Sequence, residues 1–373
     1  MKRIDLSEYK NNIKFIKLFE ILIKEKHSNK DDFLSSIKIT PSTFRRAREG
    51  DSKHSSQIVR TLANHFDLKY VDNQLIDELE DKINRLYFNI YYEIKTTFDE
   101  DLEEINALLE EKYIIYPVIL MFKMLMLMND FRHTNDFVNR NMELYKEIEK
   151  YKSFYNDDLL EFYDVIEMNF NEEPSDSYLK KEYKNELINA SLARRCMILG
   201  KYIEGLYFAD LAINHFVKTR NYKRIIFTTL TVIGIYNHLE RFEEAYNIGI
   251  GQHCALKVIN DDQLRGTTQL LAIACVGLKK YDLIIEFYKK QPSLNLTELV
   301  CYLIASYNID MDEYIETRDY YSTLKDGKYK DLFMSLDKYL KGDKKELIKK
   351  INNYHITDCL INYLKNVFKE KTQ

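Results

Sequence analysis

The sequence places three arginines and two small polar residues close together in the run TPSTFRRAREG, which spans 40–50. An arginine guanidinium can donate two parallel hydrogen bonds to O6 and N7 of guanine, or it can hold a phosphate. Short polar side chains beside it let a helix backbone approach the base edges. The run therefore predicts a surface that contacts double-stranded DNA, with the candidate residues Ser42, Thr43, Arg45, Arg46 and Arg48.

Three more polar residues, Lys53, His54 and Ser55, come where a further helix is expected to open at Ser55. The first N–H groups of a helix have no intrahelical partner, and the helix dipole favours an anion beside them. We therefore predict that these three residues contact the DNA phosphates. Such contacts fix the position of a DNA-binding domain without reading the base sequence.

Short helices are expected to position these candidates. Apolar residues at three- to four-residue spacing predict a first helix over 13–26, and Ser28 and Asn29 are N-cap candidates for a short second helix. Thr40 followed by Pro41 predicts the start of a third helix, because proline suits the first helical position. Gly50 is expected to close that helix.

The third helix is expected to have two different faces. Phe44 and Ala47 are three residues apart and would face the domain core, which turns the polar candidates outward. The charge supports this interpretation, because residues 1–70 hold 15 Lys and Arg against 9 Asp and Glu, whereas the rest holds 40 against 50. A basic segment beside an acidic one suggests that only the basic segment meets a polyanion. The alternative is a small basic cap whose arginines merely keep it in solution.

This first segment resembles a helix-turn-helix domain of the Cro/repressor (XRE-like) type. The stretch over 39–50 carries the resemblance, which implies that residues 1–70 form a DNA-binding domain. One feature departs from the family pattern. Helix-turn-helix domains of this type commonly open their second helix with Gln, and here the run Lys30-Asp31-Asp32 stands at that point.

The composition favours an all-α fold. The chain has 373 residues, 45% of them hydrophobic, with only 10 glycines and 4 prolines. Average usage would give roughly 26 and 19, so the tight turns of a sandwich, a Rossmann sheet or a TIM barrel are scarce. The length allows two domains or one long repeat array.

Internal repeats are expected in the remainder of the chain. The aromatic residues Tyr202, Phe242, Tyr281 and Tyr314 are spaced 40, 39 and 33 residues apart, and each follows an apolar helix and opens an amphipathic one. These units resemble tetratricopeptide (TPR) repeats, although the chain has no tryptophan. The resemblance implies a right-handed helical solenoid. We predict a linker over 71–83 and a TPR-like peptide-sensing and dimerisation domain over 84–373.

The repeat register implies which side chains line the inner face of such a solenoid. A peptide backbone needs groups that donate and accept at once, as the carboxamides of Asn237 and Gln269 do, whereas Arg194 would suit a carboxylate. The alternative is that these are ordinary polar residues on a solvated wall. The peptide-binding candidates are Arg194, Asn237, His238, Gln269, Tyr302 and Ser306.

Catalytic and metal motifs are missing from the sequence. It contains no phosphate-binding glycine loop, no HExxH, no GxSxG and no paired CxxC, and its eight histidines form no i, i+4 pair. We therefore expect no enzyme activity, no cofactor and no metal. The five cysteines lie among apolar neighbours, so buried free thiols are expected. With no apolar leader and no apolar run of about 20 residues, a cytoplasmic protein without a membrane segment is expected.

With a helix-turn-helix segment followed by TPR-like repeats, the whole chain resembles in architecture the RRNPP class of peptide-sensing regulators, including the phage arbitrium receptors and related clostridial regulators. That resemblance implies a homodimer that binds a DNA operator and responds to a short signalling peptide, in quorum sensing or in phage lysis–lysogeny communication. Two alternatives stay open. One is a Rap-type TPR protein that acts on a response regulator, and the other is a TPR scaffold that binds a protein tail.

Overall fold

The computed structural model describes residues 3–50, 52–94, 97–128, 137–171, 183, 185–259, 261–291, 293–323, 329–343, 345–351, 360–361 and 363–365. Over these ranges every extended regular element is a helix, and one isolated β-bridge joins Lys69 to Tyr113. The predicted all-α class is confirmed for this part of the chain. The chain packs as two compact units, Met1–Arg195 and Cys196–Gln373.

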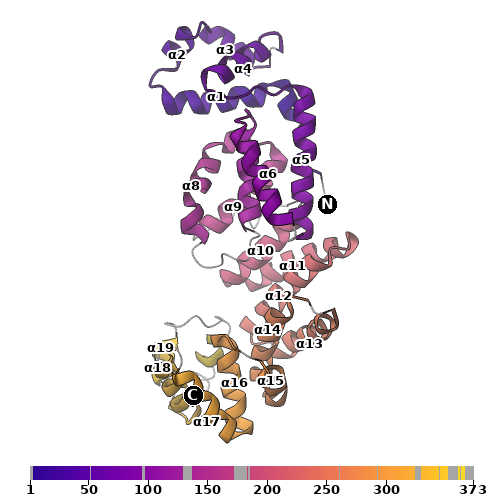
Figure 1. The fold of residues 1–373 in the computed structure, drawn as a ribbon, viewed down its shortest axis with the longest axis vertical. Helices are drawn as coiled ribbons and strands as arrows, with labels where there is room; N and C mark the ends of the chain where they lie inside the picture. Colours follow the sequence, from indigo (N-terminus) through magenta and orange to yellow (C-terminus); the bar gives the residue numbers. More distant parts are fainter. Residues whose placement is uncertain are drawn as a thin grey trace. The chain divides into compact units, whose positions relative to one another are not determined.

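Four helices open the first unit after a short 3₁₀ turn, and Figure 1 shows them grouped together in indigo. The prediction for the first three was accurate, but the fourth begins three residues earlier than Ser55. Several polar residues in this stretch can cap a helix equally well, so sequence does not select between them. The elements are η1 Ser7–Asn11, α1 Ile13–Lys26, α2 Lys30–Ser36, α3 Pro41–Arg48 and α4 Ser52–His65.

A compact apolar core holds these four helices together. Helix α1 packs against α2, α3 and α4, and α3 packs against α4. Phe19 of α1 stacks on Phe66 with ring centroids 5.8 Å apart, and Phe33 of α2 lies 5.9 Å from the same ring. Burial of such rings contributes roughly 1.5–3 kcal/mol each. The core therefore fixes the direction in which α3 faces.

Further helices complete the first unit. Helix α5 packs against α7, and α7 packs against α8 and α9. Residues 73–83 of the expected linker belong to the 20-residue helix α5. The elements are α5 Asn73–Tyr92, α6 Phe98–Glu110, α7 Tyr116–Met128, α8 Phe137–Lys150, η3 Lys152–Phe154, α9 Asp157–Phe170 and α10 Glu186–Ile198, whose last turn enters the second unit.

The second unit is a succession of packed helix pairs. Each helix from α11 to α19 packs against the next one, and α14 also packs against α12 and α16. This arrangement is consistent with a helical repeat protein, in which each pair contacts its neighbours. The elements are α11 Tyr202–Lys218, α12 Tyr222–His238, α13 Phe242–Ile259, α14 Leu264–Gly277, α15 Tyr281–Tyr288, α16 Leu296–Ile309, α17 Met311–Thr323, α18 Lys330–Leu340 and α19 Lys345–Lys350.

Three turns of this unit have the same backbone geometry. Gly200, Glu240 and Lys279 each adopt a left-handed conformation, with φ of 73°, 56° and 57°, two positions before an aromatic anchor. In each turn the following N–H donates to the carbonyl five residues back at 2.8–2.9 Å. This hydrogen bond closes the preceding helix. The predicted anchors accordingly stand as the first residues of α11, α13 and α15.

The fourth turn differs from the other three. Asp310 is extended, with φ −141°, and α17 begins at Met311. The expectation that Tyr314 opens its helix in the same register was therefore wrong by three residues. Helix α15 has 8 residues, whereas α11 and α13 have 17 and 18, and this shorter helix accounts for the 33-residue spacing in place of 39 or 40.

Four cysteines lie in the described part of the chain, and all are free thiols. Cys196, Cys275 and Cys301 are buried as expected, but Cys254 is exposed. The reason is its position on α13, whose buried face passes through the neighbouring His253 and Leu256. The expectation for Cys254 was therefore wrong.

Candidate functional site

Helix α3 is positioned by its cap and by two buried side chains. The Thr40 hydroxyl accepts the N–H of Thr43 at 3.1 Å, and Pro41 occupies the first helical position. Phe44 is 2% exposed and Ala47 is fully buried, as predicted. Because these two residues face the core, the remaining side chains of α3 point to the outer surface.

Two of the three arginines on that surface are available to a ligand. Arg45 and Arg46 are exposed, and neither forms an ion pair with any residue that the structure describes. Arg48 lies 3.6 Å from the Glu20 carboxylate, which also accepts the Lys30 ammonium at 2.8 Å. Glu20 therefore competes with an anionic ligand for Arg48 but not for its two neighbours.

Hydroxyl groups cluster at the N-terminus of α3. The Thr40 hydroxyl lies 3.0 Å from that of Ser42 and 2.7 Å from that of Thr43. Ser42 is exposed and Thr43 is half-buried. These groups lie beside the first N–H groups of a helix, where a phosphate or a base edge is favoured.

The three residues at the start of α4 that were predicted to contact phosphates are not exposed hydroxyl groups like those of α3. The side chains of Lys53 and His54 lie outside the described residues. Ser55 is 2% exposed, so its hydroxyl does not reach the surface in this structure. A phosphate contact at this position would use the backbone of the helix start.

The six predicted peptide-contacting residues are divided between the two units. Arg194 is exposed on α10 and belongs to the first unit, whereas the other five belong to the second. Gln269 is half-buried on α14, and its side-chain oxygen accepts the amide of Asn295 at 3.2 Å. His238 is half-buried and stacks on Tyr202, with ring centroids 5.3 Å apart.

The other three peptide candidates are buried. Asn237 is 1% exposed and donates its amide to the Leu270 carbonyl at 2.9 Å, which joins α12 to α14. The Tyr302 hydroxyl donates to Glu313 at 2.8 Å, and the Ser306 hydroxyl donates to the carbonyl of Tyr302 at 2.8 Å. The side chains of Asn237 and Tyr302 therefore contact neighbouring helices, whereas that of Ser306 contacts the preceding turn of its own helix.

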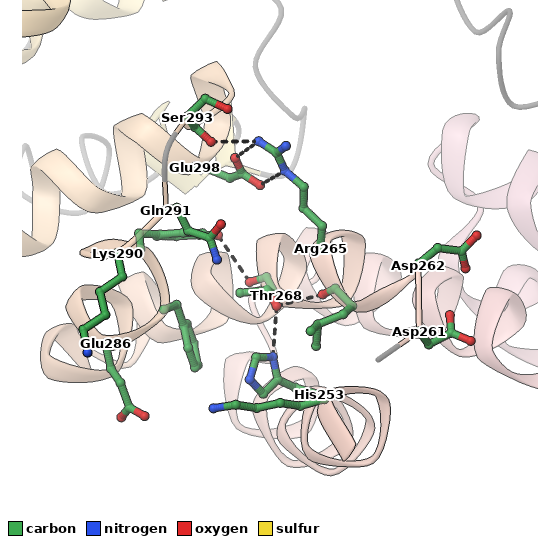
Figure 2. Close-up of a pocket in the computed structure, with 14 residues that line it drawn as sticks. His253, Asp261, Asp262, Arg265, Thr268, Glu286, Lys290, Gln291, Ser293 and Glu298 are labelled. Carbon is green, nitrogen blue, oxygen red and sulfur yellow. Dashed lines mark hydrogen bonds and ion pairs between the residues drawn. The ribbon is translucent and has the colours of Figure 1, made fainter. Parts of the chain in front are cut away.

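A pocket that the sequence did not reveal lies in the second unit (Figure 2). It has a volume of about 370 Å³ and lies among the ends of α13, α14, α15 and α16. None of the six predicted peptide residues lines it. Its lining residues are His253, Lys257, Asp261, Asp262, Leu264, Arg265, Thr268, Glu286, Phe287, Tyr288, Lys290, Gln291, Ser293 and Glu298.

A histidine and a threonine that line the pocket are joined by a hydrogen bond (Figure 2). The Oγ1 atom of Thr268 lies 2.9 Å from Nδ1 of His253 and 2.7 Å from the carbonyl of Leu264. Burial lowers the pKa of His253 below its ordinary value, and nearby Lys257 lowers it further.

One wall of the pocket holds an ion pair between the exposed Arg265 and the buried Glu298. Glu298 is 2% exposed and accepts two hydrogen bonds from Arg265, at 2.8 Å and 2.6 Å. The same carboxylate accepts the N–H of Asn295 and caps α16. Because both carboxylate oxygens of Glu298 already accept hydrogen bonds, this ion pair has a structural role and offers no acid or base to a substrate.

Comparison with protein-family models, curated proteins and solved structures finds no match for the chain. Within the ranges that the structure describes, no three His, Cys, Asp or Glu side chains are grouped as a metal site requires. No helix in those ranges has the length and apolar character needed to cross a membrane.

Proposed function

We propose that this protein is a DNA-binding transcriptional regulator whose operator affinity is controlled by a short peptide bound to its helical repeats. The observation that carries the proposal is the outer face of α3. It presents Arg45 and Arg46 without acidic partners among the described residues, next to the hydroxyls of Ser42 and Thr43. This is the combination that reads base edges in a major groove.

The packing of α3 supports this use. Helix α2 ends at Ser36 and α3 begins at Pro41, so a short turn joins two short helices. Lys38 takes a left-handed conformation with φ 62°, and the N–H of Ile39 closes the turn onto Leu34 at 2.9 Å. A tight turn of this kind holds the second helix rigidly against the first, as a helix-turn-helix motif requires.

Fewer residues support peptide binding than the sequence suggested. Arg194, His238 and Gln269 are the candidates whose side chains reach solvent, whereas Asn237, Tyr302 and Ser306 would act by positioning helices. A ligand that binds one arrangement of the repeats better than another shifts the equilibrium between them. In a homodimer such a shift would change the spacing of the two DNA-reading helices.

Fluorescence anisotropy on DNA from the upstream region of the gene, across a salt series, tests the DNA-binding function. We expect tight, sequence-selective binding with a steep salt dependence, because phosphate contacts release counterions. The double variant R45A/R46A should lose selective binding while it keeps its helix content. The control K345A/K349A removes the same charge from exposed positions on α19 and should bind normally.

Two results would contradict the proposal. One is equal, weak binding of the unaltered protein to any duplex, which would favour a response regulator or another protein as the partner. The other is an unchanged operator affinity in R45A/R46A, which would exclude α3 as the DNA-reading helix.

A further inference from the structure

Residues Arg3–Leu6 precede η1 without regular secondary structure, and two of their side chains are buried in the first unit. Ile4 is 3% exposed and Leu6 is fully buried, whereas the intervening Asp5 is exposed. Figure 1 shows this end of the chain beside α5. A segment outside helices and sheets has no regular hydrogen bonds of its own, so its buried backbone groups need partners elsewhere.

Asn84 of α5 satisfies the backbone of Ile4 completely. Its side-chain oxygen accepts the N–H of Ile4 at 2.8 Å, and its amide donates to the carbonyl of Ile4 at 3.0 Å. The same amide donates to the carbonyl of Glu80, one helical turn earlier, at 2.9 Å. Asn84 is 7% exposed, so these hydrogen bonds are shielded from water.

Two more side chains hold the next residues of the segment. The Glu80 carboxylate accepts the N–H of Leu6 at 2.8 Å, and the Asn156 amide donates to the carbonyl of Asp5 at 2.8 Å. The side-chain oxygen of Asn156 caps α9 through the N–H of Leu159. Side chains of α5 and the cap residue of α9 therefore form hydrogen bonds to the backbone of residues 4–6. A peptide-binding groove recognises the backbone of its ligand in the same way.

The contact continues from the segment into α1. The Tyr9 hydroxyl donates to the carbonyl of Phe154 at 3.2 Å, and the two rings lie 5.0 Å apart. The Lys14 ammonium donates to the carbonyl of Tyr155 at 3.0 Å. Residues before and within the first turns of α1 are therefore fastened to α5, η3 and the start of α9.

The other end of the α1–α4 group is fastened as well. After α4 the N–H of Lys69 donates to the carbonyl of Lys112 at 2.8 Å, and its carbonyl accepts the N–H of Ile114 at 3.0 Å. This anchor joins residues 43 and 45 positions apart, and the first anchor joins residues 80 and 151 positions apart. The α1–α4 group is therefore held on both sides by contacts between residues distant in sequence.

We propose that Arg3–Leu6 is a strap that occupies a backbone-recognising groove between α5 and α9, and that it holds helices α1–α4 in one orientation on the rest of the first unit. The groove takes a segment with apolar side chains at alternate positions, here Ile4 and Leu6. Release of the strap leaves α1–α4 attached through Tyr9, Lys14 and the segment after α4, and so less firmly held. This inference does not depend on what α3 binds.

Hydrogen exchange on the full-length protein tests the strap. In the unaltered protein the amides of Ile4 and Leu6 should be protected, because the N–H of Ile4 donates to the buried Asn84 and the N–H of Leu6 donates to the half-buried Glu80. Asn84→Ala should raise their exchange rates about tenfold or more, since it removes two hydrogen bonds from the strap. Asn169→Ala is the matched control, because Asn169 bonds only the carbonyl one turn earlier on α9, and it should leave the strap protected.

A synthetic peptide with the sequence of residues 2–11, blocked at both ends, tests the groove. The full-length Leu6→Asp variant should lose protection at the strap and at Tyr9, and the added peptide should restore protection along α5 around Asn84. The unaltered protein, whose groove is filled, should not respond to the peptide.

Three outcomes would overturn the inference. They are rapid exchange of Ile4 and Leu6 in the unaltered protein, unchanged exchange in Asn84→Ala, and no effect of the peptide on Leu6→Asp. If Leu6→Asp fails to fold, the peptide is added to Ile4→Ala, which keeps Asn84, and the same protection pattern decides. None of these measurements uses DNA, so they are independent of the proposed function.

Discussion

Gly277 ends α14 directly against the ring of Phe242, the aromatic anchor that opens α13. A β-carbon at Gly277 would overlap three carbon atoms of that ring. The absence of a side chain therefore lets the end of one repeat helix seat the anchor of the preceding pair. A larger residue at Gly277 cannot be accommodated unless the Phe242 ring moves.

This contact predicts opposite effects for two glycine substitutions. Gly277→Ala should destabilise the protein by about 1–3 kcal/mol, because the new methyl group forces Phe242 out of its place. Gly251→Ala, on α13 with no atom near its position, should stabilise the protein by about 0.5–1 kcal/mol through helix propensity. Urea unfolding followed by circular dichroism measures both, and equal effects would contradict the close contact.

The ion pair between Glu20 and Arg48 predicts a graded response in DNA affinity. Glu20→Gln should strengthen binding by about threefold at low salt, because it frees Arg48 and removes a negative charge near the DNA. Arg48→Ala should weaken binding less than Arg45→Ala does. Anisotropy titrations of the three variants at two salt concentrations decide, and a larger loss in Arg48→Ala would contradict this order.

The buried carboxamide of Asn237 predicts a structural effect where the sequence suggested ligand binding. Asn237→Ala leaves the Leu270 carbonyl without its side-chain donor and should cost about 1–2 kcal/mol of unfolding free energy. Gln269→Ala should change stability by less than about 0.5 kcal/mol and should weaken the peptide response of DNA binding. Thermal unfolding and peptide dose curves separate the two effects. Normal stability in Asn237→Ala would show that its hydrogen bond to Leu270 is unimportant.

The environment of His253 predicts a pH dependence of stability. Its pKa in the folded state lies below the ordinary value near 6.5, because burial and Lys257 disfavour the charged form, although Glu286 opposes them. As the pH falls, His253 is therefore protonated at a higher pH in the unfolded chain than in the folded protein. Protonation favours the unfolded chain, so the folded state loses stability below about pH 6.5.

Comparison of the unaltered protein with His253→Gln separates the contribution of His253 to the pH dependence of stability from the contributions of the other histidines. The difference in urea midpoint between the two proteins should be constant above pH 7 and should shrink or change sign as the pH falls through 6, because the glutamine does not titrate. Lys257→Ala should reduce the acid-dependent loss. A difference that stays constant down to pH 5 would show that the pKa of His253 is not lowered.

Local sequence patterns predicted the elements that local forces determine. Thr40 and Pro41 fix the start of α3 because an N-cap acceptor and a preset φ act within one turn of the chain. The anchors Tyr202, Phe242 and Tyr281 mark helix starts for a similar reason, since each follows a turn of the same geometry. The outward direction of Arg45 follows from the burial of Phe44 and from helical periodicity.

The left-handed turn residues were harder to predict, because only one of three is glycine. Glu240 and Lys279 adopt positive φ values that a sequence pattern does not announce. Their conformation is enforced by the hydrogen bond that closes the preceding helix and by the packing of the two helices that the turn joins.

The sequence by itself determined that this protein is helical, where several of its helices begin, and which face of α3 carries the arginines. Only the tertiary structure decided that Asn237 and Ser306 are buried, that His253 and Glu298 border one pocket, and that Asn84 holds the backbone of Ile4. The physical reason is range. Helix starts depend on bonds between residues a few positions apart, whereas burial depends on which distant helices pack together, and a single sequence does not specify those partners.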